Sequence, residues 1–179
     1  MTGSKQALSW AKGVLELFKG QRVEIVSFVP DNGLTDLIAL CQGEAGMRAV
    51  TLTTEEEGIA LAAGAYLGGK RSALLLQSSG VGNCPNMLSL PGVCGMPLFL
   101  LITMRGEWGE FNPWQVPMGQ GAARLLETCG VIVQRAETAE EVVPTVEAGL
   151  KLAFDSSTRV AVLLAQRLIG TKQFTGGAK

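Results

Sequence analysis

Residues 48–77, RAVTLTTEEEGIALAAGAYLGGKRSALLLQ, decide the fold because they hold a strand, a helix and a second strand in succession. We predict strands over Arg48–Leu52 and Ala73–Gln77, two short apolar runs without clean period-two alternation. Such runs are typical of strands that are buried on both faces of a parallel sheet. The segment between them, Glu55–Leu67, has helical spacing.

The same alternation continues on both sides of this segment. Four more apolar runs are predicted strands: Val23–Val29, Pro97–Thr103, Gly130–Gln134 and Arg159–Ala165. Five more segments are predicted helices: Lys5–Lys19, Gly33–Cys41, Pro85–Val93, Gly119–Cys129 and Ala139–Phe154. The pattern predicts an α/β fold, a doubly wound, mostly parallel six-stranded sheet with helices on both faces.

The length of 179 residues predicts one domain, over residues 1–170, followed by a polar C-terminal tail over residues 171–179. Apolar residues make up 47% of the chain and charged residues 17%, which favours a well-buried domain or one with a large subunit interface.

Charge and hydropathy exclude several partner classes. The net charge of −1 leaves no basic field for a nucleic acid or an anionic membrane surface. The longest apolar run, Met96–Met104, is too short to cross a membrane, and the first ten residues lack a signal-peptide apolar region. We therefore expect a cytoplasmic protein that binds neither nucleic acid nor membrane.

The residues available for chemistry are restricted. The chain has no histidine, which removes the commonest general base and the commonest metal ligand. Its four cysteines include no C-x-x-C pair, which argues against a zinc site or a redox pair, so we expect reduced and mostly buried thiols. Chemistry must therefore use carboxylates, backbone groups or a borrowed cofactor.

Three glutamates follow the strand Arg48–Leu52. Thr54 and Glu57 have the spacing of a capping box, which explains one glutamate structurally. Glu56 is left for another task, and the carboxyl end of a parallel strand is where α/β folds bind ligands.

Three other segments follow predicted strands. In Q77-S-S-G-V-G-N83 two glycines let the backbone approach a ligand, although a tight turn is the simpler explanation; the segment fits neither a dinucleotide nor a Walker fingerprint. In V29-P-D-N-G33, Asp31 or Asn32 could cap the next helix.

In R105-G-E107, the guanidinium could hold a carboxylate, sulfonate or phosphonate, or form a surface ion pair with Glu107 or Glu110. This last segment opens a long irregular stretch, Arg105–Met118, of the kind that is usually functional or covers an interface.

In this order, the segments resemble the pyrimidine-binding domain of thiamine diphosphate enzymes, most closely sulfopyruvate decarboxylase alpha subunits and phosphonopyruvate decarboxylases. The most specific motifs are E-E-E-G-I-A-L-A-A-G-A-Y-L-G-G-K and L-L-Q-S-S-G-V-G-N. Family members carry a glutamate ten residues before the helix tyrosine, here Tyr66, so the resemblance assigns this role to Glu56. That glutamate hydrogen-bonds the ring nitrogen of the cofactor's aminopyrimidine and activates the cofactor.

The resemblance implies roles for further residues. The residues that would bind the cofactor in addition to Glu56 are Pro30, Ser79, Gly80 and Asn83. Those that would bind the substrate are Asp31, Asn32, Ser79, Arg105 and Gln115. The implied reaction releases CO2 from 3-sulfopyruvate and gives sulfoacetaldehyde. One alternative is a phosphonopyruvate or other 2-oxoacid decarboxylase subunit, because Asn32 and Met104 replace a serine and a histidine that are common in the family at positions that bear on substrate choice. A separate alternative is a non-catalytic assembly partner with the same fold.

The chain lacks the G-D-G motif with which thiamine enzymes hold the diphosphate and Mg²⁺. The resemblance therefore implies a separate beta subunit that carries this motif and the metal, with no metal ligands on this chain. An α₂β₂ or larger assembly is the expected form.

Overall fold

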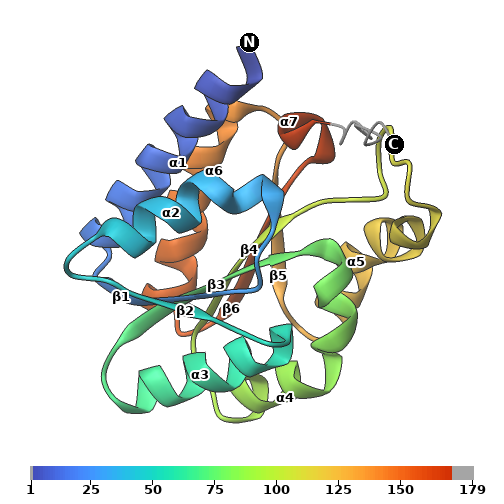
Figure 1. Cartoon of the computed structure of the whole chain (residues 1–179). Helices are drawn as coiled ribbons and strands as arrows, with labels where there is room; N and C mark the ends of the chain where they lie inside the picture. Colours follow the sequence, from blue (N-terminus) through green and yellow to red (C-terminus); the bar gives the residue numbers. More distant parts are fainter. Residues whose placement is uncertain (1, 171–179) are drawn as a thin grey trace.

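A computed structural model of the chain describes residues 2–170, with side chains from residue 10 onward, as one six-stranded sheet (Figure 1). The predicted tail, residues 171–179, lies outside the described residues. The strand order is β2-β1-β3-β4-β6-β5, and every neighbouring pair is parallel. The strands are β1 (Val23–Phe28), β2 (Arg48–Thr51), β3 (Arg71–Gln77), β4 (Leu98–Thr103), β5 (Ile132–Ala136) and β6 (Arg159–Leu164).

Seven α-helices lie in the described part of the chain: α1 (Thr2–Gly20), α2 (Thr35–Gly43), α3 (Glu55–Leu67), α4 (Pro85–Val93), α5 (Val116–Thr128), α6 (Ala139–Asp155) and α7 (Gln166–Ile169). Three short 3₁₀ helices accompany them: η1 (Asn32–Leu34), η2 (Ser78–Asn83) and η3 (Pro113–Gln115). The predicted α/β fold class is confirmed, and the sheet is parallel throughout.

Several boundaries differ from the prediction by one to three residues, and two of these differences have a clear local cause. Strand β5 begins at Ile132 rather than Gly130, because Gly130 adopts a φ of 75° in the turn that follows α5. Helix α5 begins at Val116 rather than Gly119, since Pro117 stands in its first turn, where its missing N–H costs nothing.

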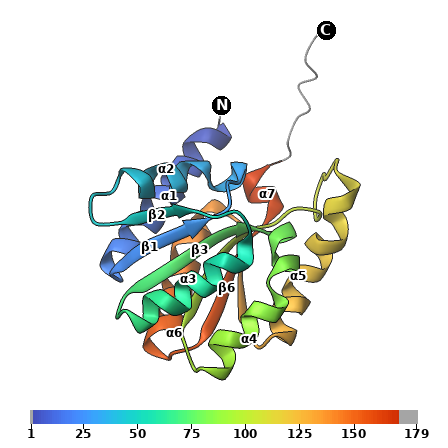
Figure 2. The same ribbon diagram turned by 60° about the horizontal axis from the view of Figure 1, so that its bottom comes forward.

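The helices cover the sheet in two layers. Helices α1, α2 and α6 pack on one face and α3, α4 and α5 on the other; Figure 2 looks towards the face that carries α3 and α4. Strand β4 explains why period-two alternation is missing: all six of its residues are buried. Phe99 and Leu101 face the first layer, while Leu98, Leu100 and Ile102 face the second.

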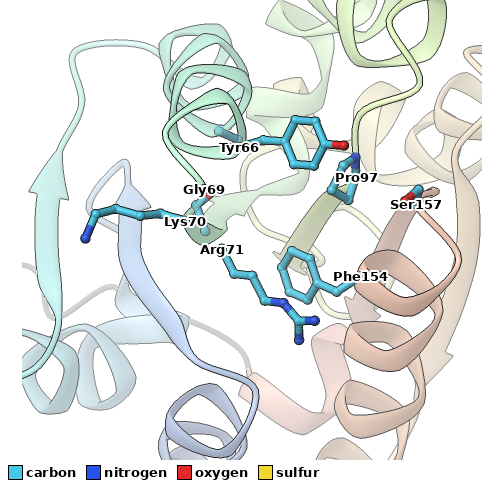
Figure 3. Close-up of a pocket in the computed structure, with 9 residues that line it drawn as sticks. Tyr66, Gly69, Lys70, Arg71, Pro97, Phe154 and Ser157 are labelled. Carbon is cyan, nitrogen blue, oxygen red and sulfur yellow. The ribbon is translucent and has the colours of Figure 1, made fainter.

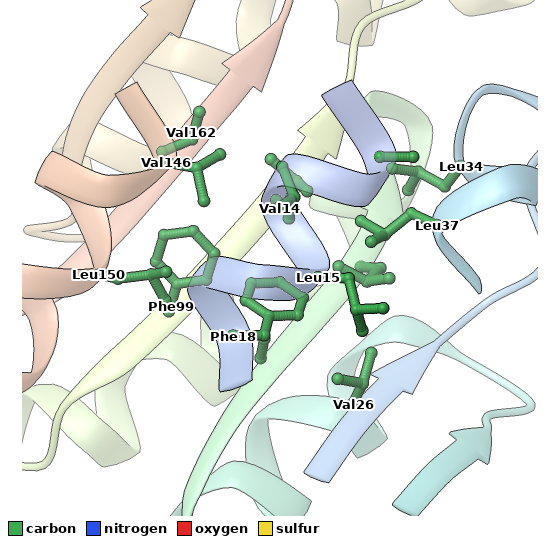
Figure 4. Packing of buried hydrophobic residues seen from close by; sticks show 14 of the residues in the cluster. Val14, Leu15, Phe18, Val26, Leu34, Leu37, Phe99, Val146, Leu150 and Val162 are labelled. Atoms are coloured by element: carbon green, nitrogen blue, oxygen red, sulfur yellow. The ribbon is translucent and has the colours of Figure 1, made fainter. Parts of the chain in front are cut away.

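Aromatic packing fixes the first layer against the sheet. Phe18 of α1 meets Phe99 of β4 edge to face, with ring centroids 6.2 Å apart, and both side chains are fully buried (Figure 4). Val14 of α1 and Leu150 of α6 lie beside this pair.

The four cysteines are free thiols, as expected, but only Cys41 and Cys84 are fully buried. Desolvation raises the pKa of both buried thiols to about 12, so they pack as small apolar groups. Among the described residues, no helix is long and apolar enough to cross a membrane.

Candidate active site

The predicted site residues gather at one edge of the sheet. Because all six strands are parallel, the segments that follow them emerge at the same edge. Chain connections run outward in opposite directions from the adjacent strands β1 and β3, so the space between their carboxyl ends is the topological switch point. Ligands of open α/β sheets bind in this crevice.

Asp31 joins three strands at this point. Its carboxylate accepts hydrogen bonds from Gln77 after β3 (2.6 Å), from the Thr103 hydroxyl at the end of β4 (2.7 Å) and from the backbone N–H of Gly33 (3.0 Å). The last bond caps η1, which confirms the capping role considered for Asp31. The remaining bonds fix the carboxylate at the switch point.

A cavity of about 110 Å³ adjoins this cluster. Asp31, Asn32 and Arg105, three of the residues assigned to the substrate, line it together with Gly33, Thr103 and Ile169. Ser79 lies outside this lining and donates a hydrogen bond to the Gln77 side chain (2.8 Å), one step from Asp31. Gln115 is also outside the lining, and its side-chain oxygen is buried without a hydrogen-bond partner among the described residues.

The predicted capping box is wrong in its partners. Glu57 reaches back to Thr53, accepting from its backbone N–H (3.0 Å) and its hydroxyl (2.6 Å), and these bonds lower the pKa of Glu57. Thr54 forms no cap, because its hydroxyl donates instead to Glu56. Glu57 is therefore the structural glutamate, as expected, but its partner is Thr53 rather than the predicted Thr54.

The other two glutamates of the run differ in their surroundings. Glu55 accepts a hydrogen bond from Asn83 (2.7 Å) and packs over Gly80, where an added Cβ would overlap the Glu55 side chain. Glu56 is half-buried on the first turn of α3, with the Thr54 hydroxyl as its hydrogen-bond partner in the described part of the chain. Gly80 and Asn83 thus lie beside the glutamate run, while Pro30 is exposed between β1 and η1.

Arg105 forms a buried ion pair rather than the surface pair that was considered. Its Nε and Nη2 donate to the two oxygens of Glu110 at 2.7 and 2.6 Å, and the two side chains are 8% and 3% exposed. Glu107 pairs instead with Arg135 at 2.7 and 2.8 Å. Burial follows because the long segment after β4 folds back over the edge of the sheet.

Two glycines allow that segment to fold back. An added Cβ at Gly119 would overlap the backbone oxygen of Arg105, and one at Gly106 would overlap the backbone oxygen of Gln115. Gly106 also has a φ of 77°, which favours glycine. Gly106 and Gly119 therefore mark a close backbone crossing between residues 105–106 and 115–119.

Sequence reasoning missed Gln166, the first residue of α7. Its side chain is buried, accepts hydrogen bonds from the backbone N–H groups of Glu107 (2.9 Å) and Trp108 (3.0 Å), and donates to Glu110 (2.9 Å). The available signal was its place directly after β6, at the same edge as the other site segments.

Met104, one of the two departures from the family pattern, is 1% exposed and packs in the core with Leu126 and Leu163. It does not line the 110 Å³ cavity. Position 104 therefore holds a core side chain here, because a thioether suits apolar surroundings. Its bearing on substrate choice stays a prediction.

Glu110 should make stability sensitive to acid. The hydrogen bonds from Arg105 and from the backbone of Asn112 and Gly106 hold its pKa at about 2, below the usual 4.5. Because the folded pKa is the lower one, the stabilisation is complete above the unfolded pKa and is lost as the pH falls towards 2. We expect urea unfolding to give a free energy that falls over this range, and to fall less for Glu110→Gln. Equal slopes in both proteins would contradict this assignment.

Charges are distributed unequally along the strand direction. Acidic side chains outnumber basic ones at the carboxyl edge, where Asp31, Glu55, Glu56, Glu57, Glu107, Glu110 and Glu137 lie together with Arg105, Arg135 and Arg167. At the opposite edge, the basic residues Arg22, Arg48, Lys70, Arg71 and Arg159 begin or precede strands, together with the acidic residues Glu24, Glu44 and Asp155.

A second cavity, of about 230 Å³, lies at the opposite, amino-terminal edge of the sheet (Figure 3). Its lining includes Tyr66, Lys70, Arg71, Pro97, Phe154 and Ser157. The Arg71 guanidinium donates a hydrogen bond to the Gln21 side chain (2.9 Å) and lies over the ring of Phe154. None of the predicted site residues lines this cavity. Among the described residues, no group of His, Cys, Asp or Glu side chains is arranged to hold a metal ion.

The sequence matches no family model, but it is similar to curated proteins. The sulfopyruvate decarboxylase subunit alpha of Methanococcus maripaludis is 35% identical over 143 residues, which cover 79% of this chain and 86% of that one. The subunit of the same name from Methanocaldococcus jannaschii is 32% identical over 151 residues, 84% of this chain and 89% of that one. Phosphonopyruvate decarboxylase of Streptomyces viridochromogenes is 38% identical over 112 residues, 62% of this chain but only 28% of its own length.

Among solved structures, the 2-oxoglutarate:ferredoxin oxidoreductase from Magnetococcus marinus has a similar fold, with a TM-score of 0.69 over 94% of this chain. The chain spans about a third of that protein's length (34%). At 17% sequence identity, the likeness concerns the fold alone.

Proposed function

Because the chain belongs to the family of sulfopyruvate decarboxylase alpha subunits, we propose that it is one subunit of a decarboxylase that releases CO2 from 3-sulfopyruvate and leaves sulfoacetaldehyde. One observation carries the proposal: the similarity covers 86–89% of three relatives of that name, so it extends over nearly the whole subunit.

Thiamine diphosphate is the cofactor that we propose for this reaction. When bound, it supplies the nucleophilic carbon that attacks the 2-oxo group and the electron sink for decarboxylation. The donor set of this chain suits the pyrimidine end, since Glu56 offers a half-buried carboxylate with one oxygen engaged by Thr54. Ser79, Gly80, Asn83 and Pro30 would border the same crevice.

The proposed task of Glu56 is to hold a proton at the ring nitrogen of the pyrimidine. A carboxylate that hydrogen-bonds a weakly basic ring nitrogen can share a proton with it. The Thr54 hydroxyl would orient this carboxylate. Glu57 is committed to Thr53 and Glu55 to Asn83, which supports the assignment of Glu56.

The 110 Å³ cavity is the proposed place for the acidic groups of the substrate. Arg105 would donate hydrogen bonds to a carboxylate or sulfonate, with Asp31 and Asn32 beside it. Ser79 and Gln115 would reach the substrate from outside this cavity, and the unpaired side-chain oxygen of Gln115 is consistent with a missing donor.

The partner that we propose is a beta subunit that holds the diphosphate and Mg²⁺ through a G-D-G motif, in an α₂β₂ or larger assembly. The name "subunit alpha" of the relatives supports a second chain. Phosphonopyruvate is the second candidate substrate, because a phosphonopyruvate decarboxylase is 38% identical over 112 residues.

The test is CO2 release by this chain co-expressed with its candidate beta subunit, with thiamine diphosphate and Mg²⁺ added. Sulfopyruvate, phosphonopyruvate and pyruvate are compared, and each chain alone is the control. We expect turnover of sulfopyruvate that needs both chains. Faster turnover of phosphonopyruvate would select the second candidate, and turnover of none of the three would reject the enzymatic proposal.

A further inference from the structure

We infer that Glu110 and Gln166 are positioning residues for the substrate, acting through Arg105. This inference deepens the proposed function and rests on it. Glu110 grips two nitrogens of the guanidinium, Nε at 2.7 Å and Nη2 at 2.6 Å. A paired contact of this kind fixes the plane of the guanidinium as well as its place.

Glu110 is itself held from three sides. Its carboxylate accepts from the backbone N–H of Gly106 (3.2 Å), from the backbone N–H of Asn112 (3.0 Å) and from Nε2 of Gln166 (2.9 Å). Because the Glu110 side chain is only 3% exposed, the carboxylate cannot rotate away from these donors into solvent. The position of Arg105 is therefore set by the backbone of its own loop.

Gln166 connects that loop to the sheet. Its side-chain oxygen accepts from the N–H groups of Glu107 and Trp108, while its nitrogen donates to Glu110. Since Gln166 begins α7 directly after β6, the segment around Arg105 is anchored to a buried strand.

The pairing also determines what Arg105 can offer. Its positive charge is matched by Glu110, so recognition of an anionic group depends on directed N–H donors more than on net charge. The Nη1 group has no hydrogen-bond partner in the described part of the chain, and Arg105 lines the 110 Å³ cavity. The N–H donors of Arg105 can bind an anionic group of the substrate only if the guanidinium is held at the angle that points them towards it.

The experiment is a double-mutant cycle in the complex with the beta subunit, with KM and kcat for 3-sulfopyruvate as readouts. Glu110→Gln should raise KM about tenfold and change kcat by less than about threefold, because a charge-assisted hydrogen bond is lost. In an Arg105→Ala background the same substitution should have no further effect on KM. Glu140→Gln removes the same charge from an exposed site on the first turn of α6 and should leave KM unchanged.

Gln166→Glu is the second variant, since it keeps the acceptor for the loop N–H groups and removes the donor to Glu110; we expect KM to rise here as well. Thermal unfolding of each variant shows whether the chain still folds. An equal effect of Glu110→Gln with and without Arg105, or an unchanged KM in Arg105→Ala, would overturn the inference and leave the proposed function standing. An inactive wild-type complex would overturn both.

Discussion

Replacement of Glu56 by glutamine should lower the rate of CO2 release from 3-sulfopyruvate by about 10²- to 10⁴-fold, the usual contribution of a positioned acid–base group. The amide keeps the size of the side chain and its contact with Thr54, but it cannot exchange a proton with a ring nitrogen. The measurement is kcat of the complex with the beta subunit, at saturating thiamine diphosphate and Mg²⁺.

The chain supplies a matched control one residue away. Glu57→Gln removes the same charge from the same turn of α3, but Glu57 is exposed and bonded to Thr53. Its loss should lower the free energy of unfolding slightly, because the bonds to Thr53 weaken, and leave kcat within about threefold. If Glu57→Gln abolished turnover and Glu56→Gln did not, the register that places Glu56 ten residues before Tyr66 would be wrong.

Replacement of Gly119 by alanine should destabilise the chain by about 3 kcal/mol, and lower its Tm by roughly 6–12 °C. The added Cβ would overlap the backbone oxygen of Arg105, which no side-chain rotation can relieve. Residues 105–106 must then separate from α5, so the guanidinium leaves its place and turnover of 3-sulfopyruvate should be lost with the stability. Thermal unfolding of the isolated chain and CO2 release by the complex measure the two effects.

Gly121→Ala is the control on the same helix. Nothing lies within 4 Å of a Cβ at Gly121, so alanine should stabilise α5 by up to about 1 kcal/mol through its higher helix propensity. If both variants had similar Tm values, the close backbone crossing at Gly119 would not limit stability.

The order of the fold could be predicted because its signals are local. Apolar runs marked all six strands, and the bounds of α3 and α4 matched the prediction, since proline or acidic residues mark their first turns. The predicted start of β5 was too early because valine is typical of strands. The backbone N–H of Val131 instead donates to the backbone oxygen of Leu126 in α5, so Val131 belongs to the turn after that helix. Only the three-dimensional path of the chain distinguishes these two uses of a valine.

The candidate site was predictable only in part. Strand ends marked Asp31, Glu56 and Arg105, but the partners of these residues depend on contacts distant in sequence. The bonds of Asp31 to Gln77 and Thr103 span 46 and 72 residues, and that of Gln166 to Glu110 spans 56. Burial of the Arg105–Glu110 pair depended on how a loop without a regular period folds back.

The excess of carboxylates at one edge of the sheet has a consequence for assembly. Three of the seven carboxylates at the edge that holds the candidate site pair with Arg105 or Arg135, and at the opposite edge Lys70 and Arg71 pair with Glu24 and Asp155. Asp31 and the run Glu55–Glu57 form no ion pair in the described part of the chain, so the site edge carries an excess of negative charge. A partner surface of positive charge would attract this edge and orient the chain with its site edge foremost before contact. With such a partner, the association rate constant of the two subunits should fall as ionic strength rises, while their dissociation rate constant changes little.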